Sequence, residues 1–215
     1  MRKHAFETGG FYHIFNRGTD KRNIFLDQKD YARFLESMEA FNALSPIGSL
    51  YELSFGKTWD SRRNPESDQL VNIICYCLNP NHFHFILEQR VDGGISEFMK
   101  RLSGGYTCYF NTKNKRSGVL YQGKFKSVPV ISNEQLLHLS VYVNLNHLAH
   151  KLQDDFTQSS WNEYLGNSSS SICKKEIILK QFSNPGEYKI FAEDTLKNIL
   201  ERKEQLYDLE SLLLE

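Results

Sequence analysis

The sequence predicts an α+β fold: a ferredoxin-like antiparallel sheet with helices packed on one face, followed by a helical C-terminal extension. Three observations predict it. Strand-like and helix-like segments follow one another in the order strand, helix, strand, strand, helix, strand, helix. The two middle strands are separated by a short turn, which predicts a hairpin. The composition changes after residue 166, where a serine-rich stretch precedes an acidic tail with apolar stripes.

The first half of the pattern consists of one strand and one helix. Residues 11–17 (FYHIFNR) are aromatic and apolar and end before a glycine, which is typical of a strand. Asp27 precedes apolar residues at helical spacing and is the expected N-cap of a helix that the Ser-Pro pair at 45–46 stops. Residues 56–69 are polar and contain Gly and Pro, so we expect a loop there.

The second half begins with the hairpin. Residues 70–78 (LVNIICYCL) and 82–88 (HFHFILE) are apolar enough for two buried strands, and Asn-Pro-Asn at 79–81 predicts the turn between them. The remaining expected elements are a helix at about 95–112 capped by Ser96, an extended segment at 119–130, and a helix capped by Ser132 or Asn133 that runs through His150.

The change in composition predicts two units, a sheet-containing domain at 1–166 and a helical extension at 167–215. Residues 167–171 (NSSSS) resemble a linker, and the rest of the tail predicts two helices around a Pro-Gly turn at 185–186. We interpret this tail as a packing or partner surface rather than as a place for chemistry.

The composition is that of an ordinary soluble globular protein. The 215 residues are 40% hydrophobic and 24% charged, and the formal net charge is zero, so any nucleic-acid surface must be local. No apolar stretch approaches the length of a membrane span. The four cysteines form no C-x-x-C pair, which argues against a zinc knuckle. Their number and spacing fit a protein of the reducing cytoplasm best.

His82 and His84 stand two residues apart at the start of a predicted strand. Side chains alternate along a strand, so both imidazoles point to the same face and can together bind a divalent cation. Such a pair is weak on its own and is often structural. Its apolar flanks, however, leave two buried histidines in need of partners. We expect His13, His138 and His147, which stand alone, to be structural or at the surface.

Tyr142 and Asn146 are four residues apart in the segment HLSVYVNLNHLAH at 138–150, so we expect them on one face of a helix. An amide oxygen is a hard metal ligand, and a phenol oxygen can attack phosphorus to form a covalent phosphotyrosine. The structural alternative is substantial, because the chain has 11 tyrosines and most tyrosines on such helices only pack. Tyr106 and Tyr109 are the other candidates for a nucleophile.

A basic stretch without any acidic residue runs from residue 100 to residue 127. Aromatic residues interleave with its cations, as expected of a surface that binds phosphates and stacks on unpaired bases. A solvated charged face over core aromatics is the alternative. The expected DNA-binding residues are Lys100, Arg101, Lys113, Lys115, Arg116, Lys124 and Lys126, together with Arg17 after the first strand.

Several motifs, taken in order, resemble a known family. They are YHIFNRGTDKRNIFLDQKDYARFL near the start, CYCLNPNHFHFIL at the histidine pair, SGGYTCYFNTKNKRSGVLYQGKFKS in the basic stretch, YVNLNHLAH around Tyr142 and, more weakly, WNEYLG at 161–166. Over residues 8–166 the chain resembles the REP-associated tyrosine transposases, which belong to the insertion-sequence-200-like group of single-tyrosine HUH transposases.

The resemblance implies that residues 1–166 form a HUH endonuclease domain acting on single-stranded DNA that contains a hairpin, in transposition and DNA recombination. It implies a 5′-phosphotyrosine intermediate on Tyr142. It also implies Mg²⁺ or Mn²⁺ held by His82, His84 and Asn146. The family includes monomers and homodimers, and both remain open here.

Two features depart from the family, and other functions compete. His147 stands where relatives often have proline, and the loop at 45–69 looks longer than usual. One alternative is a non-catalytic module that binds single-stranded nucleic acid on a ferredoxin-like sheet and needs no metal. Others are a replication-initiator or relaxase nuclease with the same histidine pair, and an inactive domesticated relative.

Overall fold

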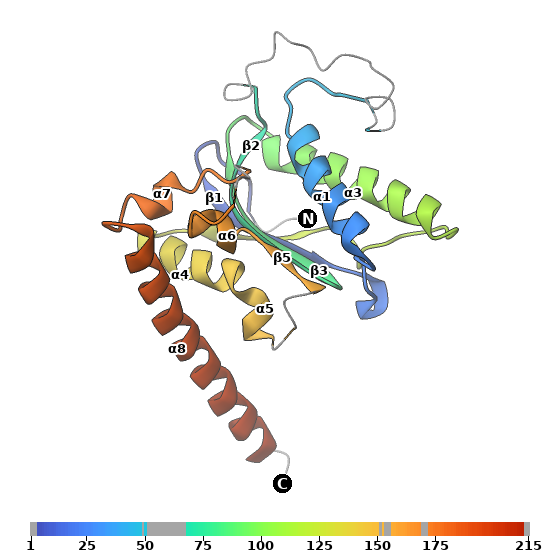
Figure 1. Cartoon of the computed structure of the whole chain (residues 1–215). Helices are drawn as coiled ribbons and strands as arrows, with labels where there is room; N and C mark the ends of the chain where they lie inside the picture. The colour runs from blue at the N-terminus through green and yellow to red at the C-terminus, as the bar shows by residue number, and fades with distance from the viewer. Residues whose placement is uncertain are drawn as a thin grey trace.

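An antiparallel sheet lies at the centre of the molecule (Figure 1). The computed structural model describes residues 4–48, 50, 68–150, 152, 156–168 and 172–212, with side chains up to residue 203. The loop expected at 56–69 lies outside these residues apart from its last two positions, and so does most of the serine-rich stretch at 167–171.

Within the described residues the sheet has five strands in the order β4-β1-β3-β2-β5, and every neighbouring pair is antiparallel. The hairpin expected from the sequence is confirmed as β2 and β3. The short strand β5, which pairs with β2, was not expected. The strands are β1 (Phe11–Arg17), β2 (Val71–Asn79), β3 (His82–Gln89), β4 (Lys126–Val130) and β5 (Gln158–Ser159).

The helices follow the expected order along the chain. They are α1 (Gln28–Ala40), α3 (Gly94–Lys113), α4 (Asn133–Asn144), α5 (Asn146–Ala149), α6 (Trp161–Tyr164), α7 (Glu176–Leu179) and α8 (Pro185–Leu212), with a 3-10 turn η1 at Thr19–Lys21. Among the described residues, no helix has both the length and the apolar character needed to cross a membrane.

Helices cover both faces of the sheet, so the expectation of one covered face was wrong (Figure 1). On the first face, α1 and α3 pack over an apolar cluster that includes Phe34, Phe83 and Phe98. On the second face, α4, α6, α7 and α8 contribute to a separate cluster that includes Tyr164 and Tyr188. The second face is covered because the C-terminal tail brings its own apolar side chains to it.

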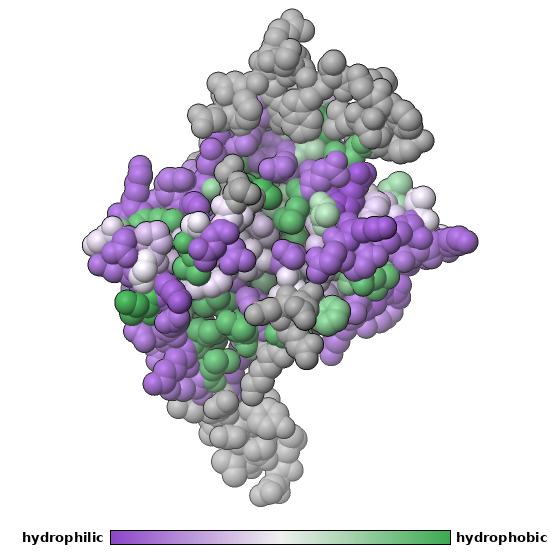
Figure 2. Space-filling model, in the orientation of Figure 1, coloured by the Kyte–Doolittle hydropathy of each residue, from purple (hydrophilic) through white to green (hydrophobic). Residues whose placement is uncertain are grey.

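Side-chain alternation on β1 separates the two faces. Tyr12 and Ile14 belong to the cluster on the first face, so His13, Phe15 and Arg17 point to the second. Figure 2 shows hydrophobic surface, on a mostly hydrophilic view, between the positions of α5 and α8 in Figure 1.

Helix caps agree with the sequence at two of three positions. Asp27 caps α1 by accepting a hydrogen bond from the backbone N–H of Asp30 at 3.1 Å, and Ser132 caps α4 in the same way. The cap expected at Ser96 is wrong, because α3 begins after Gly93, whose φ of 67° is left-handed. The next residue, Gly94, is also constrained, since a Cβ there would lie 2.3 Å from a backbone oxygen.

The long helix expected through His150 is divided in two. α4 ends at Asn144, Leu145 has φ −110° and ψ 21°, and α5 begins at Asn146. Asparagine side chains compete with the helical backbone for hydrogen bonds. Here the asparagines on both sides of Leu145 are fully buried and hydrogen-bonded to other elements. In the tail, Pro185 begins α8 instead of forming a turn between two helices.

Candidate active site

The histidine pair lies on β3, near the middle of the sheet, on the face that α4 covers. His82 is 6% exposed and His84 is 8% exposed, and their ring centroids are 5.1 Å apart. The expectation that both rings share one face is therefore confirmed. The residues directly opposite the pair on the neighbouring strands are Phe15 and Arg17 of β1 and Cys77 and Asn79 of β2.

Hydrogen bonds fix the orientation of His82. Its Nδ1 lies 2.5 Å from Oδ1 of Asn81, so Nδ1 carries the hydrogen and donates it to that oxygen. Its Nε2 then carries no hydrogen, and the lone pair of Nε2 accepts a hydrogen bond from Nδ2 of Asn79 at 2.9 Å. The same Nε2 is 3.3 Å from Oδ1 of Asn146. This is the tautomer that a metal ligand needs.

His84 is oriented by His13, a residue that sequence reasoning had set aside. Nδ1 of His84 is 2.9 Å from Nε2 of His13, and the two rings stack with centroids 5.1 Å apart. A hydrogen on Nδ1 of His84 satisfies this contact and leaves the lone pair of its Nε2 free. The alternation of the first strand puts His13 on the face of Phe15 and Arg17, but only the pairing of β1 with β3 brings it to His84.

Burial keeps these imidazoles neutral. It lowers the pKa of His82 to about 4; the hydrogen bond that the protonated ring would donate to Oδ1 of Asn146 acts in the opposite direction, and the charges of Arg17 and His150 lower the pKa further. Burial also lowers the pKa of His13 to about 4. The pKa of His84 is well below 6.5, first through burial and then through His13 and His82. Neutral imidazole is the form that binds metal ions.

Asn146 reaches the pair from α5 through a bridging residue of β2. Nδ2 of Asn79, which is fully buried, donates to Oδ1 of Asn146 at 2.7 Å as well as to His82. The two hydrogens of this side-chain amide therefore point to the lone pairs of His82 Nε2 and Asn146 Oδ1, which face a common place. Nδ2 of Asn146 is buried and has no partner among the described residues. Asn79 was treated only as part of a turn in the sequence.

Tyr142 lies over the histidines from α4. Its ring centroid is 5.7 Å from that of His84 and 6.1 Å from that of His13, both in edge-on geometry. The ring is half-buried. Tyr142 and Asn146 are distant in sequence from His84, and the structure brings all three to one region.

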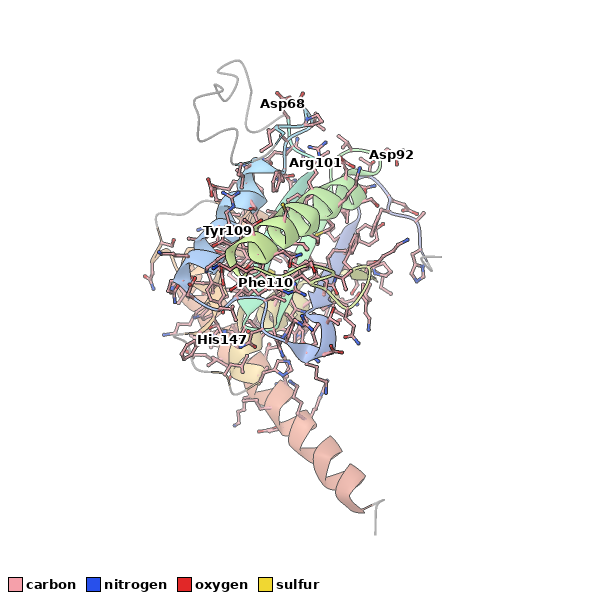
Figure 3. All side chains as sticks on the ribbon, turned by 90° about the vertical axis from the view of Figure 1, so that its right-hand side faces the viewer. Asp68, Asp92, Arg101, Tyr109, Phe110 and His147 are labelled. Atoms are coloured by element: carbon pink, nitrogen blue, oxygen red, sulfur yellow. The ribbon has the colours of Figure 1, made fainter. Side chains whose placement is uncertain are left out.

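The other tyrosine candidates lie on the first face. Tyr106 is fully buried on α3, and its hydroxyl donates to the backbone oxygen of Ile24 at 2.6 Å. Tyr109, also on α3, donates to Asp30 at 3.1 Å. Figure 3 labels Tyr109 on α3, well separated from His147, which marks α5. Neither hydroxyl is placed to act with the histidine pair.

The chemistry of these ligands fits a small divalent cation. Ligand atoms at about 2.1 Å from Mg²⁺ lie roughly 3 Å apart, and Nε2 of His82 and Oδ1 of Asn146 are 3.3 Å apart. Nδ2 of Asn79 lies beside both of these atoms and donates a hydrogen bond to each. The electron pairs of His82 Nε2 and Asn146 Oδ1 therefore already face a group with partial positive charge, as they would face a cation. No set of three or more His, Cys, Asp or Glu side chains suited to a metal ion occurs in the described part of the chain. The fit therefore depends on two imidazoles and one carboxamide.

The basic residues divide into two groups. Arg101, Lys113 and Arg116 are held by protein groups: Arg101 by Glu97, Lys113 by Asp27 and Asp30, and Arg116 by the oxygen of Asn111. In Figure 3, Arg101 lies on α3. Lys100 pairs with Glu97 at 3.3 Å but remains exposed. The other exposed lysines of the stretch are Lys115, Lys124 and Lys126, while Arg17 is half-buried opposite His82.

The central part of the chain matches a protein-family model. Residues 60–146, less than half of the chain, match the model described as "Transposase IS200 like". Over this segment the chain is similar to the IS200-like transposases. The match contains the histidine pair and Tyr142 and ends at Asn146, so the four residues that meet in the structure lie inside the matched segment.

The chain is similar to a structure described as that of the REP-associated tyrosine transposase bound to a REP hairpin, with a TM-score of 0.49 and 13% identity over 80% of this chain and 88% of that one. A likeness at this level assigns nothing to individual residues. No curated protein matches the chain.

Proposed function

We propose that this chain is a metal-dependent, single-tyrosine transposase that cuts and rejoins single-stranded DNA, with Tyr142 as nucleophile. One observation carries the proposal: inside the matched segment, the ring of Tyr142 lies 5.7 Å from that of His84, whose Nδ1 is 2.9 Å from Nε2 of His13. A phenol beside neutral, oriented imidazoles is a suitable arrangement for phosphoryl transfer.

The reaction exchanges one phosphoester bond for another. The Tyr142 oxygen attacks phosphorus, the bond from phosphorus to the 3′ oxygen breaks, the phenol proton passes to solvent, and the leaving oxygen takes up a proton. The products are a 5′-phosphotyrosine and a free 3′-hydroxyl. A second 3′-hydroxyl then attacks this link, and the tyrosine hydroxyl is restored. No ATP is required, because the number of phosphoester bonds is unchanged.

His82, His84 and Asn146 would hold Mg²⁺ or Mn²⁺. When bound, such an ion supplies positive charge that polarises the phosphate and stabilises charge on its oxygens. The protein's own part is orientation. Asn81 contacts Nδ1 of His82 and His13 contacts Nδ1 of His84; with a hydrogen on each Nδ1, the lone pairs of both Nε2 atoms would be available to the ion.

The proposed partner is single-stranded DNA containing a hairpin, bound by a monomer or a homodimer. Phe15 is half-buried and stacks beside His84 with centroids 5.7 Å apart, which offers an aromatic surface to an unpaired base. Arg17, opposite His82, is the cation best placed to meet the scissile phosphate. Exposed Lys115, Lys124 and Lys126 would follow the DNA backbone further away, with Lys100.

The test uses a pool of 3′-labelled single-stranded oligonucleotides, each with one hairpin stem flanked by randomised bases. Incubated with Mn²⁺, the wild-type protein should acquire the label in a form that survives denaturation, and chelation should prevent it. Tyr142→Phe should abolish the label, whereas Tyr109→Phe, the same change on the other face, should keep it. Labelling of Tyr142→Phe contradicts the assignment. Metal-independent binding without any adduct supports the non-catalytic alternative.

A further inference from the structure

A chain of buried hydrogen bonds runs behind the helix that carries Tyr142. The hydroxyl of Tyr188, on α8, lies 2.9 Å from Oγ of Ser140 and accepts a hydrogen bond from Nδ2 of Asn144 at 3.2 Å. Oγ of Ser160 donates to Oδ1 of Asn144 at 2.6 Å, and the backbone N–H of Tyr76 on β2 donates to Oγ of Ser160 at 2.9 Å. The chain thus links α8, α4 and the sheet.

The direction of the contact between Tyr188 and Ser140 follows from the other contacts of Ser140. Oγ of Ser140 donates its hydrogen to the backbone oxygen of Leu137 at 2.7 Å. The Tyr188 hydroxyl therefore gives its own hydrogen to Ser140, while it accepts one from Asn144. Tyr188, Ser140, Asn144 and Ser160 are all fully buried. A fully satisfied buried network favours one arrangement of the elements it joins.

The network holds α4 on the side away from the nucleophile. Ser140 and Asn144 are two residues before and two residues after Tyr142. At about 100° per residue, they lie on nearly the opposite side of the helix from it. A rotation of α4 that moved the Tyr142 ring relative to His84 would break the contacts of Tyr188 with both.

The helix α8 makes a second contact nearby. Nζ of Lys203 donates to the backbone oxygen of Ala149, at the end of α5, at 3.0 Å. The same helix therefore touches the element with Tyr142 and the element with Asn146. Tyr188 and Lys203 both lie beyond residue 146, where the transposase match ends.

We propose that Tyr188 is a positioning residue for Tyr142: its hydroxyl fixes the rotation of α4 and so sets where the phenol stands relative to the histidine pair. Packing alone would be served by phenylalanine. A buried hydroxyl costs free energy unless it is fully hydrogen-bonded, and this one is bonded to the two residues that flank the nucleophile. The inference rests on the proposed function.

The test compares Tyr188→Phe with Tyr164→Phe. Tyr164 is equally buried in the same cluster, but its hydroxyl donates to the backbone oxygen of Ile74 on β2 at 2.9 Å rather than to a residue of α4. Three quantities are measured for each protein: the melting temperature, the dissociation constant for the oligonucleotide selected with wild type, and the single-turnover rate of adduct formation.

Both variants should lose similar stability and bind the oligonucleotide as wild type does. Only Tyr188→Phe should slow adduct formation, by roughly 10- to 100-fold, as expected for a misplaced reacting group. A rate equal to that of wild type or of Tyr164→Phe overturns the inference. Should Tyr188→Phe fail to fold, Ser140→Ala is judged by the same criteria. Absence of adduct with the wild-type protein instead overturns the proposed function, and this inference with it.

Discussion

The two faces of the sheet are built from the same strands and differ in what they bury. On the first face, α1 and α3 close over aromatic and aliphatic side chains, and the buried hydroxyl of Tyr106 ends on a backbone oxygen. On the second face, β3 contributes His82 and His84, and polar contacts run through Asn79 to Asn146. Alternation along a strand thus gives the first face side chains that only pack, while the second face has an apolar cluster and the candidate active site as well.

The largest contrast between the faces should be seen in activity. His84→Gln removes one proposed metal ligand and is expected to slow adduct formation by roughly 10³-fold or more, because the charge that stabilises the transferring phosphate is lost. The control is His138→Gln, the same change at an exposed histidine of α4. Single-turnover labelling at saturating Mn²⁺ measures both. If His84→Gln formed the adduct at the wild-type rate, His84 would not take part in the reaction.

The next contrast is in stability. Phe34→Ala on the first face creates a cavity at a fully buried position and should lower the free energy of unfolding by about 3–5 kcal/mol. Phe15→Ala, at a half-buried position beside His84, should cost much less stability and should weaken DNA binding instead. Denaturant unfolding and fluorescence anisotropy measure the two effects. If Phe34→Ala and Phe15→Ala lowered the free energy of unfolding equally, Phe15 would be a packing residue like Phe34.

Acid should destabilise the protein because the three histidines of the second face, His13, His82 and His84, have pKa values that are lowered by burial. The folded-state pKa is about 4 for His13 and His82 and well below 6.5 for His84, while the unfolded value is 6.5. Between these values the unfolded chain binds more protons. The stabilisation is therefore complete above pH 6.5 and is lost as the pH falls toward 4, by up to about 1.4 kcal/mol per pH unit for each histidine.

Denaturant unfolding at several pH values measures this loss in wild type and in His84→Gln. The variant should have a shallower dependence on pH over the same window, since one lowered pKa is gone. Identical slopes for the two proteins would mean that His84 does not titrate as its burial requires.

The smallest effects concern the basic stretch. Lys124→Gln should weaken oligonucleotide binding only a few-fold and reduce the slope of log affinity against log salt by about 1. Lys113→Gln should leave that slope unchanged and lower stability, because Lys113 pairs with fully buried Asp30. Anisotropy titrations at several salt concentrations distinguish the two. A smaller slope for Lys113→Gln would mean that Lys113 contacts the DNA backbone after all.

Local patterns were enough to predict most of the elements. The strand at residues 11–17, the hairpin of β2 and β3, and the Asp27 cap follow from composition and spacing, and the structure confirms them. Period-two alternation also put His82 and His84 on one face. These features depend on neighbours in sequence, which is why sequence patterns contain them.

Features that depend on pairing between distant segments were missed. The contact of His13 with His84 needs the register of β1 on β3, and the bridge formed by Asn79 needs the approach of α5. The break at Leu145 arises because Asn144 and Asn146 bond to other elements. Likewise, the spacing of apolar residues within the tail predicts a helix but does not reveal that α8 packs on the second face of the sheet.

The most direct test of the account is the identity of the residue that becomes attached to DNA. The wild-type protein is reacted with the labelled oligonucleotide pool and Mn²⁺, digested with protease and nuclease, and analysed by mass spectrometry. The account predicts a phosphonucleotide on the peptide that contains Tyr142 and on no other. A modified peptide that contains Tyr106 or Tyr109 in place of Tyr142 would contradict it.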